Sequence, residues 1–304
     1  MPTGPLVATL LLVFAAVFCA AEDDYEIKVY PCPRSAGPIT VDGALDEPAW
    51  AEAPLVGGFT LYNAPTLVDV QTFFRVVYND QWLVFGVICE EPLIAKLAPV
   101  PQARDAHAVF HGETVEIFVD PTHDHANYFQ FAVSAAGSLY DSKQMDASWS
   151  AGLMAATHLG DGAWTVELAI PWDDLGIQPS PGRVIGFNVC RDRYLGQARE
   201  WTNWSQTEAN FHDPFRFAHL VLSPTPEMLA ALSEEFRSGG RRGPIVIFSE
   251  EGFAETTYRA LASTVLDKLD EALDELARTA ESEADARARE ELQRRVAEYR
   301  QEAA

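Results

Sequence analysis

Short runs in which apolar and polar residues alternate constrain the fold of this chain more than any other feature. In residues 114–120 the apolar Val115, Ile117 and Val119 alternate with mixed side chains, and residues 129–134 repeat the pattern. Successive side chains of a strand point to opposite faces, so each run predicts a strand with one apolar and one mixed polar face. A second sheet must cover the apolar faces. The sequence therefore predicts a mainly β fold, an antiparallel β-sandwich of the immunoglobulin-like or jelly-roll type.

The chain begins with a segment that is distinct from the sandwich. Residues 1–21 are largely apolar and end in Cys-Ala-Ala, which predicts a secretory signal peptide and a secreted or periplasmic protein. A membrane anchor is the alternative, but an apolar stretch of about 16 residues is shorter than the roughly 20 that span a bilayer. Residues 22–37 are expected to form a linker, and residues 38–223 the sandwich.

Residues 224–304 have a different pattern and predict an α-helical extension. A Thr-Pro-Glu start predicts a helix over 226–238, and residues 244–248 predict an apolar strap. Apolar residues then recur every three or four positions, which predicts a long helix or a helix pair over 253–302. This part is expected to fold back on itself or on the sandwich. A coiled coil that joins chains, or disorder of the charged end, is the alternative.

Six motifs follow one another through the predicted sandwich. They are ITVDGALDEPAW at 39–50, VVYNDQWLVF at 76–85, ETVEIFVDP at 113–121, WTVELAIPW at 164–172, IGFNVCR at 185–191 and FAHLVL at 217–222. Together they resemble the family 9 carbohydrate-binding module, a sandwich similar to DOMON-type domains. The resemblance implies non-covalent binding of a saccharide, usually in support of an enzyme that breaks down polysaccharides.

The resemblance also implies a binding site. In sugar-binding members two tryptophans clamp a sugar beside acidic, amide and basic side chains on the polar face of a sheet. The family's glutamate and glutamine are retained as Glu116 and Gln130. The two clamp positions fall on Phe110 and Phe211. Phenylalanine can stack on a sugar ring, with less area than tryptophan and no N–H group.

Two further positions depart from the family pattern. The family's arginine falls on Ala132 and its asparagine on Ser134. Both positions are spaced by two from Gln130, so they lie on the same polar face of the strand. Loss of the arginine removes a charge-assisted hydrogen bond worth about 1.5 to 3 kcal/mol. Candidate replacements for this donor are Lys143, Arg191 and Arg193.

The chain contains seven tryptophans, and each is a candidate sugar platform. Four lie within the motifs and are predicted to be core or turn-packing residues: Trp50, Trp82, Trp164 and Trp172. Trp149, Trp201 and Trp204 lie in polar, loop-like stretches and are the better candidates for extra platforms. The alternative is that these three seal the ends of the sandwich.

Charge and cysteine content restrict the possible partners. A formal net charge of −23 disfavours nucleic acid and anionic membrane surfaces. After signal cleavage the chain keeps Cys32, Cys89 and Cys190, so at most one intramolecular disulfide can form. Cys89 and Cys190 lie in apolar runs and are predicted to be small buried side chains.

Catalytic patterns are missing from the sequence. Glu113 and Glu116 project to opposite faces of one strand, so they cannot flank a glycosidic bond as an acid and base. His107 and His111 are four residues apart without the HExxH pattern of a zinc protease. The chain is therefore predicted to be non-catalytic and to hold a saccharide for a partner enzyme.

Three further possibilities stay open. Acidic loops near Asp42 and Asp120 are candidate positions for a structural Ca²⁺, which prefers hard oxygen ligands. A second functional hypothesis is a protein-interaction scaffold that has lost sugar binding and associates through the C-terminal helices. A minor one is a haem-binding sandwich, which needs a Met/His or Met/Lys ligand pair; Met145 and Met154 are the candidates.

Overall fold

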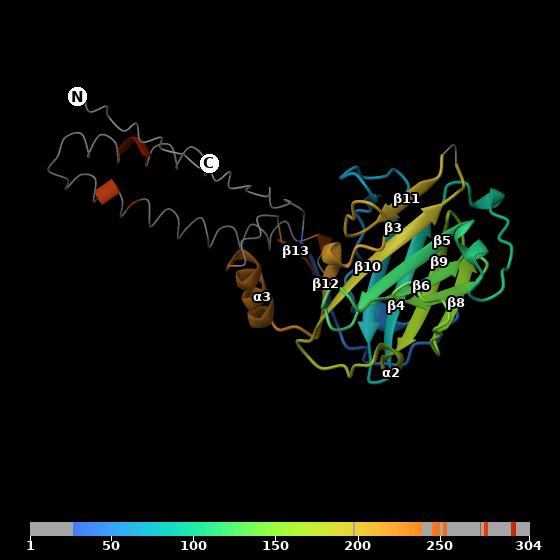
Figure 1. Ribbon diagram of the computed structural model, residues 1–304, viewed down its shortest axis with the longest axis horizontal. Coiled ribbons are helices and arrows are strands. Elements are labelled where there is room, and N and C mark those ends of the chain that lie inside the picture. Colours follow the sequence, from blue (N-terminus) through green and yellow to red (C-terminus); the bar gives the residue numbers. More distant parts are fainter. Residues whose placement is uncertain are drawn as a thin grey trace, which may run out of the picture.

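The computed structural model describes residues 27–196, 198–238, 245–249 and 252–253, with a few positions between 274 and 295. Their strands form two facing sheets, which confirms the predicted β-sandwich (Figure 1). The predicted signal peptide lies outside the described residues, as does nearly all of the predicted helical segment 253–302. Within the described part, no helix is both long and apolar enough to cross a membrane.

The larger sheet has ten strands in the described residues. Along its main path the order is β14-β13-β1-β12-β10-β5-β6-β7; β11 pairs with β10, and β2 pairs with β11. The bounds are β1 Ile27–Cys32, β2 Thr60–Leu61, β5 Thr114–Asp120, β6 Phe129–Ser134, β7 Leu139–Lys143, β10 Val184–Arg193, β11 Glu200–Asn203, β12 Ala218–Leu222, β13 Ile245–Ser249 and β14 Gly252–Phe253. Most pairs are antiparallel, whereas β1 runs parallel to both β12 and β13.

The smaller sheet has four antiparallel strands in the order β3-β4-β9-β8. Its strands are β3 Thr72–Tyr78, β4 Trp82–Glu90, β8 Met154–Leu159 and β9 Ala163–Pro171. The main core lies between the sheets and includes Val115, Ile117, Val119, Phe129, Phe131 and Val133, the apolar faces predicted from the alternation. This burial leaves the opposite face of β5 and β6 to carry the polar side chains.

The helical segments lie in the connections between strands, and all but α3 are a single turn. They are α1 Pro48–Ala51, η1 Ile94–Lys96, η2 His107–Phe110, α2 Trp172–Leu175, η3 Pro214–Arg216 and α3 Pro226–Ser238. α3 occupies the range expected from its Thr-Pro-Glu start, and its Leu229 and Leu232 pack against Ile27, Val29 and Val221 of the larger sheet. The strand β13 falls on the predicted apolar strap and pairs with β1.

The segment predicted as a linker is in part a central strand. β1 lies between β12 and β13, and its Tyr30 and Cys32 are fully buried. Tyr30 Oη accepts the Val76 N–H at 2.8 Å, which ties the larger sheet to β3. The prediction that residues 22–37 form a linker was therefore wrong. Strand β1 begins before the first family motif and contributes buried side chains to the core. Cys32, Cys89 and Cys190 are all buried and unbridged.

The motif at 39–50 covers the outer face of the smaller sheet. Trp50 packs over Gly86 of β4, where an added Cβ would come within 3.1 Å of its ring. The buried Glu167 on β9 accepts hydrogen bonds from Trp50 Nε1 at 3.1 Å and from the Gly43 N–H at 2.8 Å. Both faces of the smaller sheet are thus covered, and the open polar face belongs to the larger sheet.

Candidate functional site

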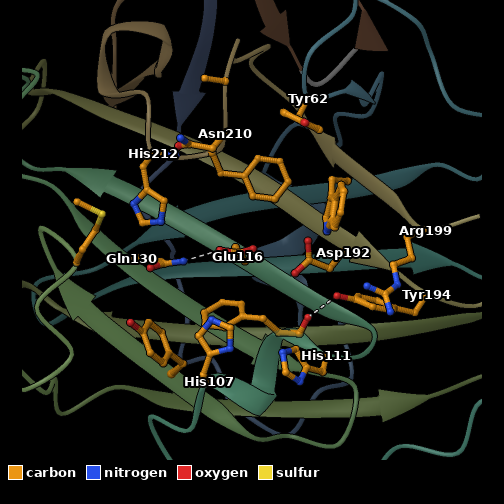
Figure 2. A pocket seen from close by; sticks show the side chains of 16 residues that line it. Tyr62, His107, His111, Glu116, Gln130, Asp192, Tyr194, Arg199, Asn210 and His212 are labelled. Atoms are coloured by element: carbon orange, nitrogen blue, oxygen red, sulfur yellow. Dashed lines mark hydrogen bonds between the residues drawn. The ribbon is translucent and has the colours of Figure 1, made fainter.

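A pocket of about 600 Å³ opens on the outer face of the larger sheet. Its floor consists of Glu116 on β5, Gln130 on β6 and Asp192 on β10 (Figure 2). Glu116 stands opposite Ala132 on one side and Cys190 on the other. Residues paired across an antiparallel ladder share a face, so the register of three strands assembles this floor.

The floor is a chain of hydrogen bonds between buried polar groups. Gln130 Nε2 donates to Glu116 Oε2 at 2.5 Å, and Ser142 Oγ donates to Gln130 Oε1 at 3.2 Å. The Glu116 and Asp192 side chains are only 5% and 3% exposed. The two carboxyls hydrogen-bond each other, which requires that one of them carries a proton.

Burial determines where this proton resides. Loss of hydration raises the pKa of Glu116 to about 7, although hydrogen bonds from Gln130 and Asp192 oppose the rise. Burial raises the pKa of Asp192 further, and the neighbouring charge of Glu116 adds to the effect. Above about pH 7 the pair therefore holds one proton, with Asp192 as the protonated partner.

Replacing Asp192 with asparagine is expected to stabilise the protein relative to wild type as the pH rises above about 4. The folded pKa lies above the unfolded value of about 3.9, so the proton-linked stability is present below that value and lost as pH rises through the folded pKa. Asparagine keeps the neutral shape and has no proton to lose. Relative to wild type, its free energy of unfolding should rise by on the order of 2 kcal/mol between about pH 4 and pH 8.

Urea unfolding of both proteins across this pH range measures the effect. Asp161→Asn, at an exposed turn between β8 and β9, is the matched control and should follow wild type. A difference between Asp192→Asn and wild type that does not change with pH would contradict the shared proton.

Aromatic rings form two walls above the floor. On one wall Phe110 contacts Tyr140, with ring centroids 4.8 Å apart. On the other, Tyr62 contacts Phe211 at 6.0 Å and Trp201 at 6.2 Å. Figure 2 shows Tyr62 and His107 on opposite sides of Glu116. Edge-to-face contacts of this kind hold the rings in place, so the pocket is a slot between two aromatic surfaces.

Three histidines and a methionine complete the rim. His107 packs on Phe110 with ring centroids 5.8 Å apart and lies 5.3 Å from His111. His212 Nδ1 hydrogen-bonds the Tyr128 hydroxyl at 3.1 Å, and burial lowers the pKa of His212, so it is neutral at pH 7. Met145 lines the rim with its side chain 66% exposed.

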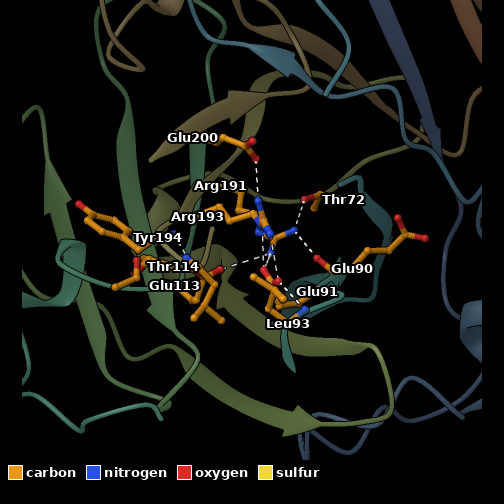
Figure 3. A network of polar contacts seen from close by, with 12 residues as sticks. Thr72, Glu90, Glu91, Leu93, Glu113, Thr114, Arg191, Arg193, Tyr194 and Glu200 are labelled. Carbon is orange, nitrogen blue, oxygen red and sulfur yellow. Dashed lines mark hydrogen bonds and ion pairs between the residues drawn. The ribbon is translucent and has the colours of Figure 1, made fainter. Parts of the chain in front are cut away.

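A buried ion-pair network holds one wall of the pocket (Figure 3). Arg193 binds both oxygens of Glu91, at 2.7 and 3.0 Å. Arg191 joins Glu91 to Glu113, at 3.4 and 3.3 Å. Glu113 Oε1 accepts the Tyr194 N–H at 2.5 Å. The network links the end of β4 to β10. It also fixes the backbone at Tyr194, whose side chain lines the pocket.

Tyr194 connects the ion-pair network to Phe110, one of the two predicted clamp residues. Its hydroxyl donates to the Phe110 carbonyl at 2.7 Å. Thr114 Oγ1 donates to the Val109 carbonyl at 2.7 Å, one residue earlier on η2. Phe110 is therefore held from β5 and from the segment after β10, although it lies on a short 3₁₀ turn.

The arginine that lines the pocket is not one of the three residues predicted to replace the family's missing arginine. Arg191 and Arg193 are 1% and 7% exposed, and their guanidinium groups are committed to the ion-pair network. Lys143 lies over the Phe129 ring at 5.3 Å and does not line the pocket. Arg199 lines it instead, with its guanidinium 4.8 Å from the centre of the Tyr194 ring. This corrects the assignment of Arg191 to the ligand site.

Three other candidate residues lie away from this pocket. Ser134 lines a separate cavity of about 160 Å³, and its Oγ accepts the Ser138 N–H at 3.2 Å. Trp149 packs against Phe129 at the edge of the core, with ring centroids 4.8 Å apart. Trp204 is fully buried between the sheets, 5.0 Å from Phe74. Trp149 and Trp204 therefore seal the sandwich, which was the alternative expectation, and neither is a platform in the pocket.

Phe110, Glu116, Gln130 and Phe211 do come together in one place. Sequence reasoning missed most of the remaining lining, including Asp192, Tyr140, Tyr62 and Arg199. Asp192 and Cys190 are two apart on one strand, and this spacing signals a common face. Only the pairing of β10 with β5 places that face beside Glu116.

The predicted calcium positions show no suitable ligand set. Asp42 Oδ1 accepts the Ala44 N–H at 2.9 Å, and the Asp120 oxygens accept the N–H groups of Asp124 and His125. In the described ranges no three His, Cys, Asp or Glu side chains converge on a point that suits a metal ion. These carboxylates do not fit a Ca²⁺ site as they stand, so calcium stays a prediction and no step of the proposed function depends on it.

The haem alternative gains little from the arrangement of the methionines. Met145 is on the rim, whereas Met154 begins β8 in the other sheet. The required pair is one methionine with a histidine or lysine, so this separation does not decide the question, and haem binding stays an untested alternative.

A two-sheet sandwich with an aromatic-walled pocket on one sheet face defines a class of β-sandwich binding modules. Within that class the chain belongs to the carbohydrate family 9 binding domain-like family, because residues 41–225, more than half of its length, match that family. The resemblance predicted from the six motifs is thus confirmed.

Several known proteins are similar to this chain. Endo-1,4-beta-xylanase A of Thermotoga neapolitana is 29% identical over 191 residues, which are 61% of this chain and 17% of the xylanase. The chain thus spans less than a fifth of that relative. A family 9 carbohydrate binding module from Caldicellulosiruptor kristjanssonii in complex with cellotriose has 19% identity and a TM-score of 0.47, covering 66% of this chain and 95% of that one. A crystal structure from Bacteroides uniformis has 15% identity and a TM-score of 0.50, covering 65% and 97%.

Proposed function

We propose that this chain binds a saccharide in the pocket between Phe110 and Phe211. One observation carries the proposal: the two clamp positions line one pocket, whose floor contains Glu116 and Gln130. These four residues were selected by motif, and they lie on η2, β5, β6 and the segment between β11 and η3. Membership of a carbohydrate-binding family supports the same function.

The chemistry of the pocket suits a sugar ring. Aromatic walls can cover the apolar C–H faces of a saccharide, which removes both surfaces from water. Ring-edge hydroxyls can donate to Glu116 and Asp192, and the Gln130 amide orients the first of these acceptors. Arg199 supplies a charged donor at the rim, in place of the arginine that the sheet lacks at Ala132.

We further propose that the chain is non-catalytic and works outside the cytoplasm beside a polysaccharide-degrading enzyme. Glycoside hydrolases hold their two carboxyls about 5 to 9.5 Å apart. The pocket carboxyls Glu116 and Asp192 instead hydrogen-bond each other, which supports a binding role. The relative named as a xylanase supports an association with such enzymes. A protein partner or self-association through the C-terminal segment remains a separate proposal, because that segment lies outside the described residues.

Removing either aromatic clamp is expected to weaken saccharide binding about tenfold, because a side chain that stacks on the ring contributes about 1 to 2 kcal/mol. Isothermal titration of the full chain with xylan and cellulose oligosaccharides, after an affinity-gel screen for the best ligand, measures the affinity. Phe110→Ala and Phe211→Ala are the test variants.

Phe215→Ala is the matched control. Phe215 is 67% exposed, stacks on His125 and does not line the pocket, so its loss should leave the affinity unchanged. Equal affinity in all four proteins would place the ligand elsewhere. A folded wild-type chain that bound no saccharide would overturn the proposed function.

A further inference from the structure

We infer that the pocket prefers a saccharide that carries a free amino group, whose ammonium would lie on the Glu116–Asp192 pair. The inference rests on the proposed function, because it specifies the ligand class of the same site. It adds a requirement for positive charge on the ligand, which the aromatic clamp and the Gln130 amide do not impose.

The observation behind it is an acidic floor without a cation. Among the residues that the structure describes, no lysine or arginine forms an ion pair with Glu116 or Asp192. The position opposite Glu116 on β6 is Ala132, and the position opposite it on β10 is Cys190. Neither neighbour can supply positive charge, and the nearest arginines of β10 point to the other face and bind Glu91 and Glu113.

Other charged and titratable groups around the pair do not compensate it. Glu113 adds negative potential at Asp192. Arg199 lies at the rim over Tyr194 and makes no ion pair with the floor, within the described ranges. His212 is neutral at pH 7 because burial lowers its pKa. Once Glu116 has ionised, the floor of the pocket therefore carries a buried negative charge without a cation among the described residues.

A ligand ammonium fits this floor better than a hydroxyl does. Ionised carboxyls only accept hydrogen bonds, and an ammonium brings three donors. Its positive charge also compensates the buried negative charge, which a neutral hydroxyl leaves uncompensated when the ligand displaces water. Aromatic walls such as Phe110 and Trp201 add cation–π attraction. An acidic saccharide would meet repulsion at the same place.

The test compares three disaccharides with matched rings, by isothermal titration of the full chain at about pH 7.5, where Glu116 is largely ionised and an amine with a pKa of about 8 largely keeps its proton. They are cellobiose, the fully deacetylated disaccharide of glucosamine, and its N-acetylated form. We expect the glucosamine disaccharide to bind at least about tenfold more tightly than the other two, as one charge-assisted contact implies. The preference should disappear in Glu116→Gln, which removes the carboxyl that ionises, and persist in Asp192→Asn, because Asp192 is the protonated, neutral partner.

Asp161→Asn controls for the general attraction of a cation to a chain of net charge −23, and it should keep the preference. A preference that survived in Glu116→Gln would be non-specific attraction and would overturn the inference. If cellobiose bound in the pocket and the glucosamine disaccharide bound no more tightly, the inference would fail while the proposed function stood. Absence of binding by all three disaccharides, with no saccharide bound in the oligosaccharide screen, would remove both.

Discussion

Replacing Trp204 with alanine is expected to lower the free energy of unfolding by about 3 to 5 kcal/mol. The indole is fully buried and packs 5.0 Å from Phe74 and 5.4 Å from Phe187, measured between ring centroids. These rings join the larger sheet to the smaller one. Truncation would leave a cavity between two sheets whose backbones are held by hydrogen-bonded ladders and cannot close around it.

Trp201 is the matched control for this prediction, because it lies three residues earlier on the same segment. It is 40% exposed and lines the pocket. Trp201→Ala should change stability by less than about 1 kcal/mol and weaken saccharide binding. Urea unfolding and ligand titration on both variants separate the two roles. Unchanged stability in Trp204→Ala would mean that this indole is not part of the core.

Replacing Glu91 with alanine should cost about 3 to 5 kcal/mol of stability, because it leaves two buried guanidinium groups without their shared counter-charge. Glu91 is fully buried and binds Arg193 at 2.7 Å and Arg191 at 3.4 Å. We also expect weaker ligand binding, since the same network positions Tyr194 through Glu113. Urea unfolding and ligand titration measure the two effects.

The adjacent Glu90 provides the control, because it is exposed and, among the described residues, its carboxylate accepts only a long hydrogen bond, from the Gln71 N–H at 3.3 Å. Glu90→Ala should stay within about 0.5 kcal/mol of wild type. Burial alone would raise the pKa of Glu91, but hydrogen bonds from Arg193 and the Leu93 N–H outweigh it and lower the pKa. Its stabilising contribution is therefore present above the unfolded pKa and lost as pH falls through the folded pKa. The Glu91→Ala deficit should shrink in acid; a deficit that is constant with pH would contradict this ionic role.

The alternation in residues 114–120 and 129–134 was sufficient to predict two strands and the face of each that is buried. It also predicted that Glu116 and Gln130 point away from the core, and the pocket floor contains both. Period-two patterns report burial directly, because one face of a sheet strand loses contact with water and the other keeps it. The motif spacing added the two phenylalanines, which lie outside regular strands.

The tryptophans show where such reasoning ends. Trp201 and Trp204 share one polar, loop-like stretch, yet one lines the pocket and the other is buried in the core. β11 pairs with β10 and ends at Asn203, so the chain then turns Trp204 inward. A local polar composition cannot report this turn, because it depends on contacts with strands far away in the sequence.

By itself, the sequence determined the sandwich, its family, the polar face of β5 and β6, and four residues of the pocket. These properties depend on local alternation and motif order, which a linear chain records. Only the tertiary structure decided that β10 lies beside β5, which puts Asp192 against Glu116 and assigns Arg191 and Arg193 to the ion-pair network. Strand pairing brings distant segments together, and the pKa of a carboxyl depends on the groups and the burial that this pairing creates.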